Sequence, residues 1–142
     1  CGLGNAGIMI VLMDTHVLVW LTGRDQRLGY EARGLVDIAA DTDSVLISAF
    51  SFWEVEMLIQ RGRLQMSQSA AGWRQRVLDL GIREIPLSGD IAILATELED
   101  FPRDAADRII AATAMMHAVT LITADPKILA WQGELARHNA RE

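Results

Sequence analysis

Short apolar runs and longer amphipathic stretches alternate along most of the chain. Four short runs rich in β-branched residues predict strands at residues 8–13, 45–48, 82–85 and 120–123. The stretches between and around them predict helices at residues 15–21, 30–40, 51–60, 70–80, 90–98 and 105–118, with a short last helix after Pro126. Because strands and helices alternate throughout, we expect a parallel sheet covered by helices on both faces.

The chain is long enough to bury one hydrophobic core, and nothing in it indicates a second domain. No repeat, low-complexity stretch or linker divides its 142 residues, so we expect one domain over residues 9–142. Residues 1–8 are rich in glycine and lack periodicity, and we interpret them as an expression remnant or a misassigned start. No apolar run approaches the roughly 18 residues that a membrane span needs. The single cysteine, Cys1, excludes an intrachain disulfide and fits a reducing cytoplasm.

Four acidic residues occupy positions from which a sheet and its helices could bring them into one cleft. Asp14 directly follows the first predicted strand, and Asp125 follows the last one. Ligands of open α/β sheets bind beyond the carboxyl ends of the strands, so these two acids lie at the expected edge. Glu54 and Asp107 belong to predicted helices with long apolar stretches. Carboxylates that converge from distant parts of a chain suit Mg²⁺ or Mn²⁺, and such a site can serve phosphodiester hydrolysis.

Each of these acids also has an ordinary structural interpretation. Asp14 and Asp125 could cap helices, and Asp104 could serve the helix dipole as a first-turn acid. Against capping alone, Asp14 ends a wholly apolar strand, where a charge is costly unless it is paired or bound to a metal. Glu54 likewise lies inside the apolar stretch 49–59. The three histidines show no zinc-binding spacing, and the sequence contains no glycine-rich phosphate loop.

Three sequence segments in a fixed order carry a resemblance to a known family. They are MDTHVLVW near the start, SAFSFWEVEMLIQRGRL in the middle and DAADRIIAATAMMHAVTLITADPKI toward the end. With this order and spacing the chain resembles PIN-domain proteins, specifically the VapC-type ribonuclease toxins of bacterial type II toxin–antitoxin systems. The resemblance extends from Met9 to about Trp131.

The resemblance implies a fold, an activity and a set of partners. The fold would be a three-layer α/β/α sandwich around a mainly parallel sheet of about four or five strands. The activity would be endoribonuclease cleavage that depends on Mg²⁺ or Mn²⁺ and leaves 5′-phosphate and 3′-hydroxyl ends. Similar proteins dimerise and are inhibited by a small antitoxin. The expected partners are therefore RNA, a cognate antitoxin and a second copy of the chain, in the cytoplasm and without a membrane.

Carried over by motif, the resemblance also assigns roles to individual residues. The residues that would hold the metal and carry out catalysis are Asp14, Glu54, Asp107 and Asp125. The residues that would support them are Thr15, Thr123 and Asp104. The net charge of −6 leaves the grip on RNA unexplained, and arginine is the side chain best shaped to hold phosphate. The candidates for phosphate contacts are Arg61, Arg63, Arg103 and Arg108.

Two features of the chain depart from the family pattern. Ala105 stands after Asp104 where many relatives have proline, which removes a rigid helix opening but no acid. The family usually closes with a short apolar strand, whereas residues 131–142 are polar. We therefore expect this last segment to be helical or frayed.

Two other classes of function stay open at this point. A PIN-fold protein with a degraded pocket could act only as a protein-interaction module. An Mg²⁺-dependent phosphatase or a receiver-like domain would also gather acids at strand ends. However, haloacid-type phosphatases need Asp-x-Asp where this chain has Asp14-Thr15-His16. Receivers need a lysine at a late strand end, and the only lysine, Lys127, follows Asp125-Pro126 instead.

Overall fold

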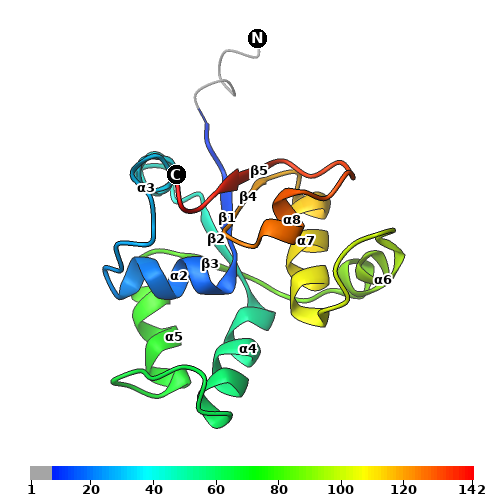
Figure 1. The fold of residues 1–142 in the computed structure, drawn as a ribbon. Helices are drawn as coiled ribbons and strands as arrows, with labels where there is room; N and C mark the ends of the chain where they lie inside the picture. The colour runs from blue at the N-terminus through cyan, green and yellow to red at the C-terminus, as the bar shows by residue number, and fades with distance from the viewer. Residues whose placement is uncertain (1–7) are drawn as a thin grey trace.

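A five-stranded sheet forms the centre of the protein, in the order β3-β2-β1-β4-β5 (Figure 1). The computed structural model describes residues 8–142. The strands are β1 Val11–Met13, β2 Val45–Ser48, β3 Arg83–Ile85, β4 Thr120–Thr123 and β5 Arg137–Asn139. Every neighbouring pair is parallel, so all five strands end at the same edge of the sheet.

The helices begin where a small polar side chain can accept a backbone N–H. They are α2 Thr15–Thr22, α3 Tyr30–Ala40, α4 Ala49–Gln60, α5 Ala70–Asp79, α6 Gly89–Glu97, α7 Ala105–His117 and α8 Pro126–Leu129. All of them except α3 have such a cap, and the capping residues are Asp14, Ser48, Ser69, Ser88, Asp104 and Asp125. Asp14 directly follows β1, Ser48 is the last residue of β2, and Asp125 lies two residues beyond β4. The ends of these strands therefore also fix the starts of α2, α4 and α8.

Helices cover both faces of the sheet, as the sequence predicts. Side chains of a strand alternate between the faces, and Val11 and Met13 lie in one core with residues of α2, α3, α4 and α5. Leu12 points to the other face and packs with residues of α7 and α8. Helix α6 lies outside this second layer, against α7. The predicted α/β/α sandwich around a parallel sheet is confirmed.

The last strand contradicts the expectation of a helical or frayed C-terminal segment. Strand β5 pairs with β4 in parallel register, Leu121 opposite Arg137. The backbone N–H of Leu121 donates to Ala136 at 2.9 Å, and that of Ala140 donates to Thr123 at 2.8 Å. Because β5 is an edge strand held by backbone hydrogen bonds, its side chains can be polar, and no apolar pattern marks it in the sequence.

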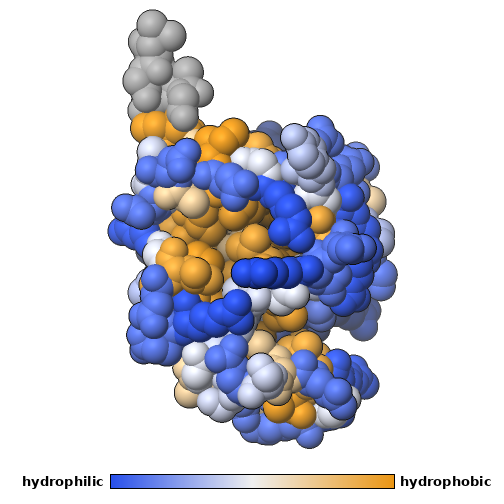
Figure 2. Space-filling model, turned by 90° about the vertical axis from the view of Figure 1, so that its left-hand side faces the viewer, coloured by the Kyte–Doolittle hydropathy of each residue, from blue (hydrophilic) through white to orange (hydrophobic). Residues whose placement is uncertain are grey.

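The surface carries several exposed apolar side chains. Figure 2 shows apolar residues gathered within a polar frame on the side of the molecule where α2, α3 and α5 lie in Figure 1. None of the helices in residues 8–142 is long and apolar enough to cross a membrane. The interpretation of residues 1–8 falls almost wholly outside the described residues.

Trp73 anchors the first core and offers a test of it. Its side chain is fully buried, and its indole N–H donates to the hydroxyl of Thr22 at 3.0 Å. We expect Trp73→Ala to lower the free energy of unfolding by about 3–5 kcal/mol, because it leaves a large cavity and removes the hydrogen bond to Thr22. Urea denaturation measures the change. The matched control is Trp53→Ala, whose side chain is half exposed, and equal losses in both variants would contradict this assignment of the core.

Candidate metal centre

A cleft of about 470 Å³ opens at the edge of the sheet where the strands end. It collects acidic residues from four separate segments of the chain. The acids that line it are Asp14, Glu54, Asp104, Asp107 and Asp125. A larger cavity of about 670 Å³, whose lining includes Phe101 and Trp131, contains none of these five acids. The sequence-predicted acids therefore converge, and we take the acidic cleft as the candidate site.

Asp14 is the most tightly held of these acids. It follows β1, it is 9% exposed, and both carboxylate oxygens accept hydrogen bonds. The backbone N–H of Thr15 donates to Oδ1 at 2.8 Å, and the hydroxyl of Thr123 donates to Oδ2 at 2.7 Å. Burial raises the pKa of Asp14 despite these bonds. The two threonines thus orient a carboxylate that burial penalises when it is charged.

Thr15 and Thr123 also connect Asp14 to the rest of the cleft. The Thr15 hydroxyl donates to the hydroxyl of Ser51 at 2.9 Å, which joins α2 to α4. The backbone N–H of Asp125 donates to the Thr123 hydroxyl at 3.1 Å. The Asp125 carboxylate in turn caps α8 by accepting the backbone N–H of Lys127 at 2.8 Å. Its capping and cleft-lining roles are therefore compatible.

Glu54 reaches the cleft from α4 with one oxygen that has no partner. Its Oε1 is buried and accepts no hydrogen bond from any residue that the structure describes. Burial raises the pKa of Glu54, and the nearby charge of Asp14 adds to the effect. A buried carboxylate oxygen without a donor is costly, and a bound cation would satisfy it.

Asp107 is a third acid in the cleft whose ionisation is disfavoured. It lies in the first turn of α7, and its backbone N–H donates to Asp104 Oδ1 at 3.1 Å. Burial raises its pKa to about 8, and repulsion from neighbouring carboxylates contributes to the shift. Those neighbours are Asp14, Asp104, Asp125 and Glu54. Repulsion of this kind is expected among acids that line one cleft, and these five do so.

The donor set fits a hard divalent cation. The five acids of the cleft offer carboxylate oxygens, which are the ligands that Mg²⁺ and Mn²⁺ prefer. Among the described residues, no three of these carboxylates bring oxygens within 4.8 Å of one another. Such spacing suits an ion that keeps several of its waters between itself and the protein.

A family model and known proteins match this chain. The model of the PIN domain matches residues 11–131. The chain belongs to the PIN-domain family. It is 32% identical over 119 residues to Ribonuclease VapC22 of Mycobacterium tuberculosis, a match that covers 83% of this chain and 88% of that protein.

Solved structures share the fold of this PIN domain. A toxin–antitoxin complex from Klebsiella pneumoniae matches with a TM-score of 0.59 and 26% identity, covering 86% of this chain and 92% of that one. VapBC2 of Rickettsia felis bound to a promoter DNA fragment matches with a TM-score of 0.67 and 17% identity, covering 92% and 98%. The resemblance read from the sequence is thereby confirmed at the level of the family.

The arginines of this PIN domain lie differently from the sequence-based expectation. Arg108 donates four of its N–H groups to backbone carbonyls of Ala95, Leu98, Phe101 and Pro102. We therefore assign it to holding the loop between α6 and α7 and no longer expect it to contact phosphate. Arg61, Arg63 and Arg103 are exposed, and none of them lines the cleft.

Two arginines that the sequence analysis missed do line the cleft. The guanidinium groups of Arg27 and Arg141 each lie 5.0 Å from the ring centre of Trp20, which also lines it. Arg27 is held by an ion pair with Asp25 at 2.7 Å. His16, an exposed residue of α2, lines the cleft as well. No sequence signal marks these residues, because a loop and the C-terminal segment bring the arginines there.

The raised pKa of Asp107 generates a prediction about stability and pH. A carboxyl with a pKa of 3.8 when unfolded and about 8 when folded destabilises the fold once it is ionised. This destabilisation is absent below about pH 4 and grows as the pH rises to about 8. In a metal chelator, Asp107→Asn should raise the free energy of unfolding at pH 8 by about 1–2 kcal/mol, a value reduced for partial solvation, and much less near pH 4. Urea denaturation at both pH values measures it. Asp37→Asn on α3 is the control. If the free energy of unfolding of Asp107→Asn depended on pH as that of the wild type does, the proposed burial and repulsion of the Asp107 carboxylate would be refuted.

Proposed function

We propose that this PIN domain is a metal-dependent endoribonuclease toxin that hydrolyses RNA phosphodiester bonds. The observation that carries the proposal is the convergence of Asp14, Glu54 and Asp107 on one cleft, with a buried and unpartnered oxygen on Glu54. The 32% identity to Ribonuclease VapC22 supports RNA as the substrate. The expected products carry 5′-phosphate and 3′-hydroxyl ends.

The proposed cofactor is Mg²⁺ or Mn²⁺, held by Asp14, Glu54, Asp107 and Asp125. When bound, the cation would activate a water and offset charge on the phosphoryl oxygens. Thr15 and Thr123 keep the Asp14 carboxylate in one orientation by donating to its two oxygens. Asp104 fixes the start of α7 and thereby the position of Asp107. With a pKa of about 8, Asp107 holds a proton near neutral pH, and it would have to lose this proton to act as a metal ligand.

Arg27 and Arg141 are proposed to hold the RNA backbone. They supply positive charge beside an acidic cleft in a chain whose net charge is −6. Stacking against Trp20 holds both guanidinium groups beside the cleft while leaving their edges available for phosphate. Arg61, Arg63 and Arg103 are proposed as more distant contacts for a longer RNA.

The proposed protein partners are a small antitoxin and a second copy of the chain. The toxin–antitoxin complex from Klebsiella pneumoniae, at 26% identity, supports the first of them. Exposed apolar residues such as Trp53 on α4, Ile93 on α6 and Met116 on α7 supply surface that protein contacts would cover. Because the substrate is RNA, we propose that the protein acts in the cytoplasm.

The alternative functions fit the cleft less well. A non-catalytic interaction module would have no need to retain five acids in one cleft at the cost that the raised pKa values of Asp14, Glu54 and Asp107 indicate. A phosphatase or a receiver would use a second acid close to Asp14 in the sequence. In this chain the residue two positions after Asp14 is His16, which is exposed.

Cleavage of end-labelled total RNA tests the proposed activity. Wild-type protein should produce discrete fragments with Mn²⁺ or Mg²⁺ and none in a chelator. Asp14→Asn and Asp107→Asn should each lower the rate roughly 100-fold or more, because each removes charge on which the site depends. Asp37→Asn serves as the control. Full activity in both cleft variants would refute the assigned site, and metal-independent cleavage would refute the proposed chemistry.

Filter binding of RNA to the inactive Asp107→Asn protein tests the arginines separately. Adding Arg27→Ala or Arg141→Ala should weaken binding about tenfold, because each removes one charge-assisted phosphate contact. The slope of log affinity against log salt concentration should decrease in magnitude by about 0.7 per arginine removed for single-stranded RNA. Arg83→Ala, an exposed arginine on β3, is the matched control. If all three substitutions weakened RNA binding equally, the overall charge of the protein would explain the binding, and the proposed role of Arg27 and Arg141 would be refuted.

A further inference from the structure

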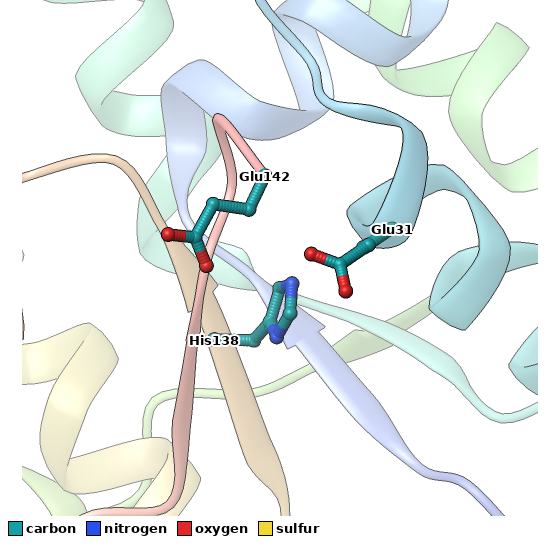
Figure 3. Close-up of side chains that lie close together, drawn as sticks. All are labelled: Glu31, His138 and Glu142. Atoms are coloured by element: carbon teal, nitrogen blue, oxygen red, sulfur yellow. The ribbon is translucent and has the colours of Figure 1, made fainter.

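A second group of possible metal ligands lies outside the acidic cleft. It consists of Glu31 from the first turn of α3, His138 from β5 and Glu142 just beyond β5. One ligand atom from each residue lies within 4.8 Å of the other two. Figure 3 shows the three side chains directed toward a common space, with the imidazole between the two carboxylates in this view.

The histidine of this cluster has an unsatisfied nitrogen. His138 Nε2 is shielded from solvent and has no hydrogen-bond partner among the described residues. Neither of the ion pairs found in the described part of the chain involves His138. The two carboxylates therefore surround the imidazole without pairing to it, and a buried ring nitrogen without a partner calls for a ligand.

The backbone that carries the three residues is fixed. The N–H of Gly29 donates to Ala140 O at 2.8 Å, and the N–H of Glu31 donates to Glu142 O at 2.6 Å. The contact is so close that a Cβ on Gly29 would lie 2.3 Å from the carbonyl carbon of Glu142. The end of the chain is thus docked onto the start of α3, and the cluster is preorganised.

We propose that Glu31, His138 and Glu142 form a binding site for Zn²⁺ or a similar borderline divalent cation. Two carboxylates and a neutral imidazole balance a charge of +2, and the nitrogen ligand distinguishes this site from the four carboxylates proposed to hold the ion in the cleft. Ligands at about 2.0–2.2 Å from a tetrahedral ion lie about 3.3–3.6 Å from one another, so ligand atoms that now lie within 4.8 Å must close by up to about 1.5 Å. Both glutamates are exposed and free to adjust their rotamers.

An ion at this site would clip β5 to α3. Arg141 lies between His138 and Glu142 in sequence and lines the acidic cleft, so the same ion would hold this arginine beside the cleft. The ligand assignment does not depend on nuclease activity, because it rests on the cluster alone.

Calorimetric titration with Zn²⁺ tests the site in the whole 142-residue chain. The background is Asp14→Asn/Asp107→Asn, which removes the strongest competing ligands in the cleft. We expect one equivalent of Zn²⁺ to bind to this protein and to raise its midpoint of thermal unfolding. Adding His138→Ala should weaken binding at least tenfold and abolish the thermal shift. Adding His117→Ala, an exposed histidine at the end of α7, should change neither.

Glu31→Gln provides a second variant in case His138→Ala fails to fold. Glu31 is exposed, so its loss of charge should weaken Zn²⁺ binding without affecting the fold. Unchanged affinity in folded His138→Ala or in Glu31→Gln would overturn the proposal, because the ion would then bind elsewhere. The absence of saturable Zn²⁺ binding in the folded background protein would overturn it as well.

Discussion

The parallel register of β1 between β2 and β4 determines where the chemistry of this protein can be. Met13 lies opposite Ile47 on one side and Ile122 on the other, so the next residue of each strand reaches the same edge of the sheet. Those residues are Asp14, Ser48 and Thr123. The Thr123 hydroxyl donates to Asp14, and Ser48 caps the helix that carries Glu54. A shift of one residue in either pairing would separate the acids and point apolar side chains into the cleft.

The carboxylates gathered by this register oppose one another. Burial and mutual repulsion raise the pKa values of Asp14, Glu54 and Asp107. Ionisation of these carboxyls therefore lowers the stability of the protein when no cation is bound. Stability is commonly reduced at functional sites in this way. A divalent cation would remove the penalty and pair the free oxygen of Glu54, which links the cost of the site to its use.

Sequence patterns predict most of the fold because its strands and helices are amphipathic or fully buried. Strands β2 and β4 have the predicted bounds, whereas β1 is shorter than the predicted run, since only residues 11–13 pair on both sides. Strand β5 escapes prediction because backbone hydrogen bonds at an exposed edge hold its polar residues. Pattern analysis detects burial, and β5 has little of it.

The residues of the candidate site likewise fall into those that the sequence identifies and those that it does not. Its acids could be identified because a charge inside an apolar segment is unusual, as with Glu54, or follows a buried strand, as with Asp14. The cleft arginines could not, because Arg27 lies in a loop and Arg141 at the end of β5, where charge is ordinary. Arg108 was assigned to phosphate because it adjoins Asp107, although its N–H groups hold backbone carbonyls. The cluster of Glu31, His138 and Glu142 has no motif, since Glu31 is about a hundred residues away from the other two in the sequence.

A crystal structure of the protein with Mn²⁺, using the anomalous signal of the ion, tests most directly whether the cleft is a metal centre. Our account predicts an anomalous peak among Asp14, Glu54 and Asp107, with Glu54 Oε1 directed at the ion or at one of its waters. A peak elsewhere, or a cleft without one at saturating Mn²⁺, would contradict the central claim that these carboxylates converge to bind a divalent cation.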